Sequence, residues 1–199
     1  MKRSIEVNEQ RKVTILNINE IKKLDNFNLF IIYQPTQKFS SIFNHIKNSK
    51  SNSFVITGKH TDFNYLNSVQ EDFEFKSTNQ VENYGANFNS SFNNFSQENI
   101  GFENFSPLEN KFVSIVTKSN IQTLLSSRIR NVVLDAPLLA FTTSNQQRDA
   151  YLFGENLWKW RSETYLAKSD FQDFDLFMDK TIQYLVSNDS KINLVVSYE

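Results

Sequence analysis

Residues 29–58 read LFIIYQPTQKFSSIFNHIKNSKSNSFVITG and hold the clearest pattern in the chain. The apolar run over 29–33 is typical of a strand that is covered on both faces. Pro35 then ends this strand. Apolar residues follow at the spacing of one helix face: Phe39, Ile42, Phe43 and Ile46. A second buried run at 54–57 completes a βαβ unit, which predicts a parallel sheet with residues 29–33 as a central strand.

The segments around this unit are less regular. Alternating Val13 and Ile15 predict an edge strand of the same sheet. Asn and Ser dominate residues 64–110, and scattered Phe side chains suggest an irregular excursion that they pin to the body of the domain. Short β-like runs come next, at 112–116, 124–125, 132–134, 138–142 and 148–153.

The C-terminal part reads as two helices and a strand. The first helix follows Gly154 and runs to about Ala167. Ser169 and Gln172, three residues apart, suggest a capping box that opens a second helix. Residues 191–199 then predict a closing strand. With no internal repeat or linker, we expect one domain over 1–199.

Composition excludes several classes of function. The 199 residues are 39% hydrophobic with nineteen Phe, which is the composition of a globular domain. A formal net charge of −1 argues against a nucleic-acid partner. Because cysteine is absent, a disulfide, a thiolate metal site and a thiol nucleophile are excluded. No long apolar run predicts membrane insertion by this segment.

Three motifs in the second half follow one another in a fixed order: Ser106-Pro107-Leu108, DAPLLAF at 135–141, and RDAYLFGENLWKWR at 148–161. This order resembles the amidotransferase-like region of bacterial membrane proteins that also carry a von Willebrand factor type A domain. That family has a proline-leucine-leucine segment before an arginine-led strand and a Gly-Glu-x-Leu-Trp-x-Trp-Arg motif. The similarity is dense over 102–199, and Asn156 stands where the family often has glycine.

The resemblance implies an α/β fold of the class I glutamine amidotransferase type, a three-layer, flavodoxin-like sandwich around a mostly parallel sheet. It also implies a soluble segment of a larger protein in the cell envelope or on the periplasmic side of a membrane; without the resemblance, we expect a cytoplasmic chain.

Catalytic members of that superfamily place a cysteine on a strained turn after a strand. The equivalent turn here is Gly58-Lys59-His60-Thr61, a degenerate elbow without cysteine or serine. Thr61 with His60 as base is conceivable, but adjacent residues on a turn point apart. His60 and Asp62 could also join Asp72 or Glu74 at a metal ion. We favour a solvated turn, and predict no metal, no cofactor and no catalysis.

The cluster Trp158-Lys159-Trp160-Arg161, with Glu155 and Tyr165 nearby, allows two interpretations. The tryptophans could stack on a sugar ring or a partner's apolar side chain while Arg161 supplies charged hydrogen bonds. Alternatively, the aromatic residues anchor a helix on the sheet, Arg161 pairs with a carboxylate and Glu155 complements the helix dipole. We favour the structural interpretation and keep these residues as candidate contacts.

Three functions remain in view. The first is a non-catalytic interaction or scaffold domain of an envelope-associated protein, whose partner is another protein or other domains of a larger parent chain. The second is a ligand-binding module for a glycan or peptide, with its site at the carboxyl ends of the parallel strands. The third is an unusual hydrolase.

Overall fold

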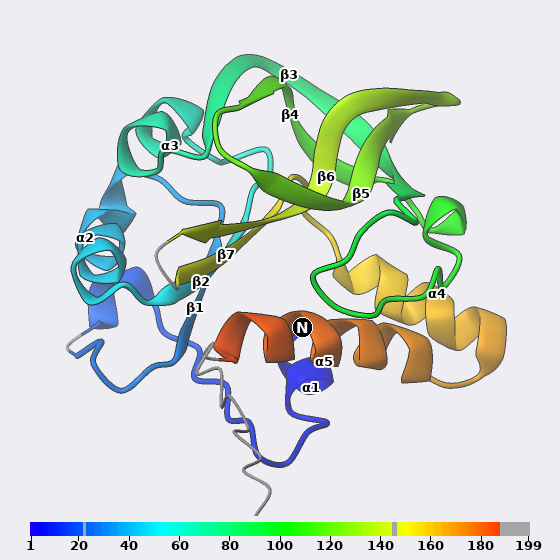
Figure 1. Ribbon diagram of the computed structural model, residues 1–199, viewed down its shortest axis with the longest axis horizontal. Helices are drawn as coiled ribbons and strands as arrows, with labels where there is room; N and C mark the ends of the chain where they lie inside the picture. The colour runs from blue at the N-terminus through cyan, green and yellow to red at the C-terminus, as the bar shows by residue number, and fades with distance from the viewer. Residues whose placement is uncertain (22, 145–146, 188–199) are drawn as a thin grey trace, which may run out of the picture.

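The computed structural model describes residues 1–21, 23–144 and 147–187. These form one curled sheet of seven strands with helices on both sides of its flatter part (Figure 1). The strands are β1 (Leu29–Tyr33), β2 (Asn52–Ile56), β3 (Phe73–Phe88), β4 (Leu108–Thr117), β5 (Ile121–Ile129), β6 (Val132–Ser144) and β7 (Gln147–Leu152). The helices are α1 (Lys2–Ile5), α2 (Ser40–Ser49), α3 (Phe63–Val69), α4 (Trp158–Lys168) and α5 (Gln172–Val186), with 3-10 turns η1 (Ile18–Glu20), η2 (Gln37–Phe39) and η3 (Phe102–Asn104).

The flatter part of the sheet consists of β1, β2 and β7, which are parallel. Alternation along β2 sends side chains to opposite faces. Phe54 and Ile56 join the core cluster that contains the apolar side of α5, including Met178. Val55 joins the cluster formed with α2 and α3, which includes Phe63. Both faces of these strands are therefore covered, as the apolar runs predicted.

The other part of the sheet is antiparallel throughout. The strand order is β1-β2-β7-β6-β5-β3-β4. Strands β5 and β6 form a hairpin in which Ile129 faces Val132 and Arg130 has a φ of +54°. The long strands β3 and β6 carry the sheet beyond its flatter part and curl it over (Figure 1). An irregularity between Ser77 and Val81 bends β3 against β4.

The expected mostly parallel, three-layer sandwich is therefore wrong. Only the pairs β1–β2 and β2–β7 are parallel, and every other strand pair in the described sheet is antiparallel. The reason is local: two residues separate β5 from β6 and two separate β6 from β7, and a connection this short can only join antiparallel neighbours. Residues 29–33 also form an edge strand rather than a central one.

The expected irregular excursion over 64–110 is wrong for most of its length, because it contains α3, β3 and the start of β4. Its polar residues over 76–80 lie on the exposed middle of β3. The phenylalanines do pin the remaining irregular part: Phe102 is fully buried, and Phe92 and Phe95 each lie 5.4 Å from the ring of Phe141.

Further predictions about local structure can be compared with the described residues. Residues 13–15 are not a strand. Ser169 ends α4 in the left-handed region at a φ of +61°, while the N–H of Gln172 bonds Asp170 Oδ1, so the predicted capping box is wrong although the helix is present. The predicted strand over 191–199 lies outside the described residues. Within the described part of the chain, no helix has the length and apolar character needed to span a bilayer.

Candidate functional site

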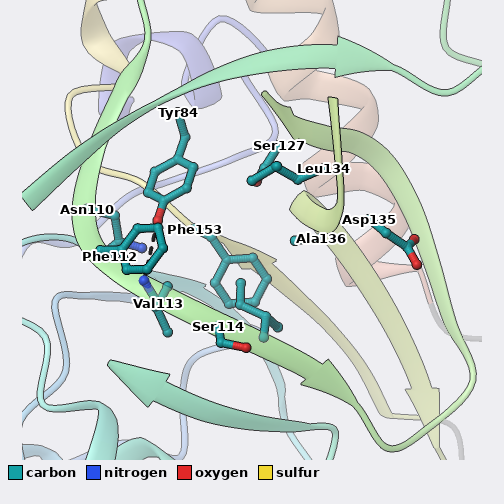
Figure 2. Close-up of a pocket in the computed structure, with 11 residues that line it drawn as sticks. Tyr84, Asn110, Phe112, Val113, Ser114, Ser127, Leu134, Asp135, Ala136 and Phe153 are labelled. Atoms are coloured by element: carbon teal, nitrogen blue, oxygen red, sulfur yellow. Dashed lines mark hydrogen bonds between the residues drawn. The ribbon is translucent and has the colours of Figure 1, made fainter. Parts of the chain in front are cut away.

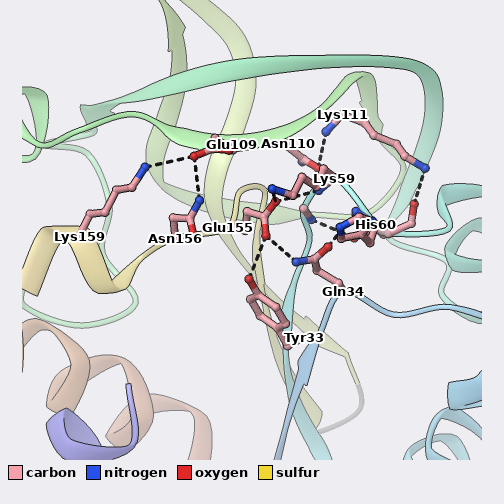
Figure 3. A network of polar contacts seen from close by, with 12 residues as sticks. Tyr33, Gln34, Lys59, His60, Glu109, Asn110, Lys111, Glu155, Asn156 and Lys159 are labelled. Atoms are coloured by element: carbon pink, nitrogen blue, oxygen red, sulfur yellow. Dashed lines mark hydrogen bonds and ion pairs between the residues drawn. The ribbon is translucent and has the colours of Figure 1, made fainter.

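Glu155 lies just beyond the carboxyl end of β7 and organises the polar residues there (Figure 3). Its side chain is 6% exposed. Oε2 accepts hydrogen bonds from the Tyr33 hydroxyl at 3.0 Å and from Gln34 Nε2 at 2.6 Å. Burial, followed by the hydrogen bond to Glu155 and the charges of Glu155 and Glu109, raises the pKa of Tyr33 against the opposing contact with Gln34, so the Tyr33 hydroxyl keeps the proton that it donates. Glu155 thus joins the ends of β1 and β7.

The same carboxylate also holds the turn after β2. Its Oε1 lies 3.4 Å from the Lys59 N–H and 3.8 Å from Lys59 Nζ. Gln34, with a φ of +50°, turns its Oε1 to accept the His60 N–H at 2.8 Å. All three parallel strands therefore meet in one set of contacts at their carboxyl ends.

This turn is the one that sequence analysis identified as a degenerate elbow. A Cβ on Gly58 would lie 2.9 Å from both Gln34 Cδ and Glu155 Cβ, so close packing requires glycine. Thr61 is fully buried, and its hydroxyl accepts the Gly58 N–H at 2.9 Å. The hydroxyl holds the turn from inside and does not face solvent as a nucleophile would.

Strand β4 is fastened to this edge. Glu109 and Glu155 exchange backbone hydrogen bonds, with N···O distances of 2.8 and 3.4 Å. The Glu109 carboxylate accepts bonds from Asn156 at 2.8 Å and Lys159 at 3.1 Å, and the Lys159 ammonium lowers the pKa of Glu109. Because its groups bind one another, this network supports the structure.

Beyond Glu109, β4 borders a hollow of about 280 Å³ that also touches the first half of β6 (Figure 2). We call this hollow the seam pocket. Its apolar lining consists of Phe112, Val113, Ile115, Leu134, Ala136 and Phe153. Its polar lining consists of Tyr84, Asn110, Ser114, Ser127 and Asp135. Apolar walls with a few polar groups are typical of ligand pockets.

Most polar groups of the seam pocket have partners. Asn110 Nδ2 donates to Thr57 Oγ1 at 2.9 Å, and Ser127 Oγ donates to the Pro137 carbonyl at 3.0 Å. Asp135 is exposed at the β6 side of the pocket, and no ion pair involves it among the residues that the structure describes. Figure 2 shows this carboxylate turned away from the apolar walls, so it can receive a donor from a ligand at the rim of the pocket.

The structure separates the candidate contacts around the tryptophan motif. Trp160 is fully buried, donates to the Ser106 carbonyl at 2.8 Å and stacks on Phe105. Trp158 is 60% exposed, and its indole N–H donates to Asn156 Oδ1 at 3.3 Å. The pair does not form one exposed aromatic platform.

Arg161 and Tyr165 meet instead at the junction of α4 and α5. Arg161 forms a two-pronged ion pair with Asp175, at 2.8 and 2.9 Å, and lies 3.7 Å from the ring centre of Phe171. Tyr165 stacks on the same ring at 4.7 Å. These contacts fix two helices to each other.

The alternative metal ligands lie in separate settings. Asp62 accepts the Tyr65 N–H at the start of α3, Asp72 binds Thr142 and Tyr151, and Glu74 pairs with Lys118. In the described ranges, no group of three acidic or histidine side chains could hold a metal ion.

The sequence patterns predicted neither the roles of Tyr33, Gln34 and Glu109 nor the seam pocket. Tyr33 ends the first apolar run and Gln34 follows it, so the rule that functional groups gather at the carboxyl ends of parallel strands could have identified both residues. The pocket had no such signal, because residues 110–115 and 134–136 meet only when the sheet curls.

Comparison with known proteins gives a fold but no family. No protein-family model matches the chain, and no curated protein matches it. The solved structure of the cytoplasmic protein STM1381 from Salmonella typhimurium LT2 is similar, with 13% identity, a TM-score of 0.52, and 80% of this chain and 72% of that one covered. At this identity the similarity shows a shared fold alone. The resemblance to amidotransferase-like envelope proteins stays a prediction, without the fold that it implied.

Proposed function

We propose that this chain is a non-catalytic binding module whose ligand places an apolar group in the seam pocket. The observation that carries the proposal is a hollow of about 280 Å³ between two strands that do not pair with each other there. A dry cavity of about 150 Å³ is enough to hold benzene in another protein, so the seam pocket has room for one aromatic group.

The chemistry of the neighbouring groups favours binding over catalysis. Neither histidine of the chain lines the pocket. The Ser127 hydroxyl donates to a backbone carbonyl. The Glu155 carboxylate already accepts hydrogen bonds from Tyr33, Gln34 and Lys59. A nucleophile needs a base within hydrogen-bond reach that a third group orients, and the described residues around the pocket supply no such set.

An apolar anchor also favours a peptide over a glycan as the ligand. Sugar recognition uses exposed aromatic faces together with many polar groups, whereas six of the residues lining this pocket are apolar. Of the two ligands considered from the sequence, we therefore propose the peptide.

Small aromatic probes test the proposal. We expect indole to shift the NMR signals of Val113, Ile115 and Ala136, which line the pocket. Ala136→Phe fills the hollow and should weaken indole binding at least about tenfold, as loss of one buried aromatic group corresponds to more than about 1.4 kcal/mol. The matched control, Ala167→Phe, changes an exposed position on α4 and should leave binding unchanged.

Thermal unfolding of both variants shows whether each is folded, and Ser114→Tyr fills the pocket from β4 if Ala136→Phe is not. The proposal is wrong if indole leaves these signals unchanged, or if a folded, filled variant binds indole as tightly as the original chain.

A further inference from the structure

We infer that the ligand of the seam pocket is an extended peptide, which adds as a new strand to the outer edge of β4 and inserts one large apolar side chain into the pocket. This inference rests on the proposed function and names its partner. Its basis is the set of β4 backbone groups that face away from β3, the few side chains that cover them, and the pocket beside them.

The outer edge of β4 is defined by its pairing with β3. Phe75, opposite Ile115, uses its N–H and C=O on the side-chain amide of Asn67, with both distances 2.8 Å. The backbone N–H and C=O of Phe75 therefore point away from β4. Because Phe75 and Ile115 form a non-hydrogen-bonded pair of an antiparallel ladder, the backbone N–H and C=O of Ile115 point away from β3. Glu109, at the same phase of β4, bonds Glu155 on that outer side.

Side chains of α3 and of Gln70 after it cover the outward groups of β3, whereas side chains cover the outer edge of β4 only as far as the Val113 N–H. Asn67 and Gln70 bond the outward groups of Phe75 and Phe73. On β4, Asn110 Oδ1 accepts the Lys111 N–H at 2.9 Å, and the Tyr84 hydroxyl makes long contacts of 3.3 Å to the Val113 N–H and 3.5 Å to the Lys111 carbonyl. Across the described residues, no hydrogen bond reaches the backbone N–H or C=O of Ile115.

The side chains of β4 also lack the usual devices that keep an edge from pairing. Natural edges carry charges, prolines or bulges. Phe112 and Val116 are 43% and 50% exposed on this strand, and the ammonium of Lys111 is turned away to the Thr61 carbonyl at 2.9 Å. The irregularity in this ribbon falls on β3, between Ser77 and Val81.

The seam pocket gives such a strand its specificity. In strand addition, main-chain hydrogen bonds supply affinity and pockets for alternate side chains supply selectivity. The apolar walls suit an aromatic or large aliphatic side chain, and the exposed carboxylate of Asp135 suits a lysine or arginine two residues along, on the same face of the strand. The occupant is therefore an extended segment with an apolar and a basic residue in alternation.

Peptide probes test this directly. The first is the capped hexapeptide Ac-TVFTKT-NH2, and two further versions carry N-methyl groups on its odd or on its even residues. Only one set of N–H groups can face β4, so we expect one methylated peptide to bind at least about tenfold more weakly while the other keeps its affinity. Replacing the phenylalanine by glycine, or Asp135→Lys in the protein, should also weaken binding.

The outcomes separate the two proposals. If indole binds in the pocket but both methylated peptides bind as tightly as the parent, the added strand is wrong and the proposed function stands. If neither indole nor any peptide binds, the proposed function fails as well. A dimer in sedimentation analysis that protects the Ile115 amide without peptide would make a second copy the occupant and overturn the peptide.

Discussion

Glu155 shows how one buried carboxylate can position three segments that are distant in sequence. It joins Tyr33, Gln34 and the turn at Lys59, and its own backbone pairs with Glu109. The side chains at the carboxyl ends of β1, β2 and β7 thus support the start of β4. The seam pocket depends on this support, because β4 is one of its walls.

Removing the Glu155 carboxylate should therefore cost stability. Glu155→Ala leaves the Tyr33 hydroxyl and the Gln34 amide without their acceptor, and we expect the free energy of unfolding in urea to fall by about 2–4 kcal/mol. Glu155→Gln keeps an acceptor oxygen and the packing, so it should cost about half as much. An unchanged unfolding midpoint for Glu155→Ala would show that the network does not hold these strands.

Asp149 makes stability depend on pH. Burial, together with the charge of Asp72, raises its pKa from 3.8 to about 6, against the hydrogen bonds from Ser53. An acid with a raised pKa binds its proton more tightly in the folded state, so its contribution is full below pH 4 and is lost as pH rises through about 6. Because the side chain is partly exposed, we expect a loss of about 1–2 kcal/mol rather than the ~3 kcal/mol of a fully buried group.

Chemical unfolding at pH 4.5 and 7.5 measures this effect. Asp149→Asn should be more stable than the original chain at pH 7.5 and should flatten the difference between the two pH values. Asp135→Asn, at an exposed position, serves as the control: it should change neither the free energy of unfolding at pH 7.5 nor its difference between the two pH values. The interpretation is wrong if Asp149→Asn keeps the original pH dependence.

Between elements, the contact of α4 with α5 depends on Arg161. Its paired bonds to Asp175 are reinforced by the ring of Phe171, so a lysine cannot replace it. We expect a double-mutant cycle of Arg161→Ala and Asp175→Ala to give a coupling free energy of about 1–2 kcal/mol in urea unfolding. A coupling near zero would mean that helix packing alone holds this junction.

The sequence predicted elements better than their arrangement. Periodicity identified β1, α2, β2, β7, α4 and α5, because each buries a face that repeats along the chain. It missed β3, whose middle is polar and exposed, and it did not identify the β5–β6 hairpin. That turn consists of Arg130 and Asn131, without the glycine that usually marks a tight hairpin. Because the pattern does not reveal this hairpin, the βαβ unit at 29–57 led to the wrong prediction that the whole sheet is mostly parallel.

The candidate site was predictable only in part for the same reason. Glu155 and the turn at Gly58 lie next to recognisable strands, so their position at the carboxyl edge follows from the βαβ unit. The seam pocket depends on how far β3 and β6 curl the sheet. Strand length, register and bulges determine this curvature, and none of them repeats in the sequence with a readable period.

At the scale of the whole molecule, the sheet curls towards a barrel without closing. Strand β6 pairs with β7 only from Leu139 onward, and β4 pairs only with β3 beyond its bridge at Glu109. The edges of these two strands that lack a partner strand border the seam pocket (Figure 2). Full closure would remove both edges, so the opening is the feature of this fold on which the proposed binding depends.

Residue-resolved amide hydrogen exchange along β4 tests this account most directly. In the free chain, the Ser114 amide, which faces β3, should exchange slowly, and the outward amide of Ile115 should exchange at least about tenfold faster. Saturating Ac-TVFTKT-NH2 should slow Ile115 to a rate close to that of Ser114. If Ile115 is already as protected as Ser114 in the monomeric free chain, or stays fast with peptide bound, the edge of β4 is not the open binding edge described.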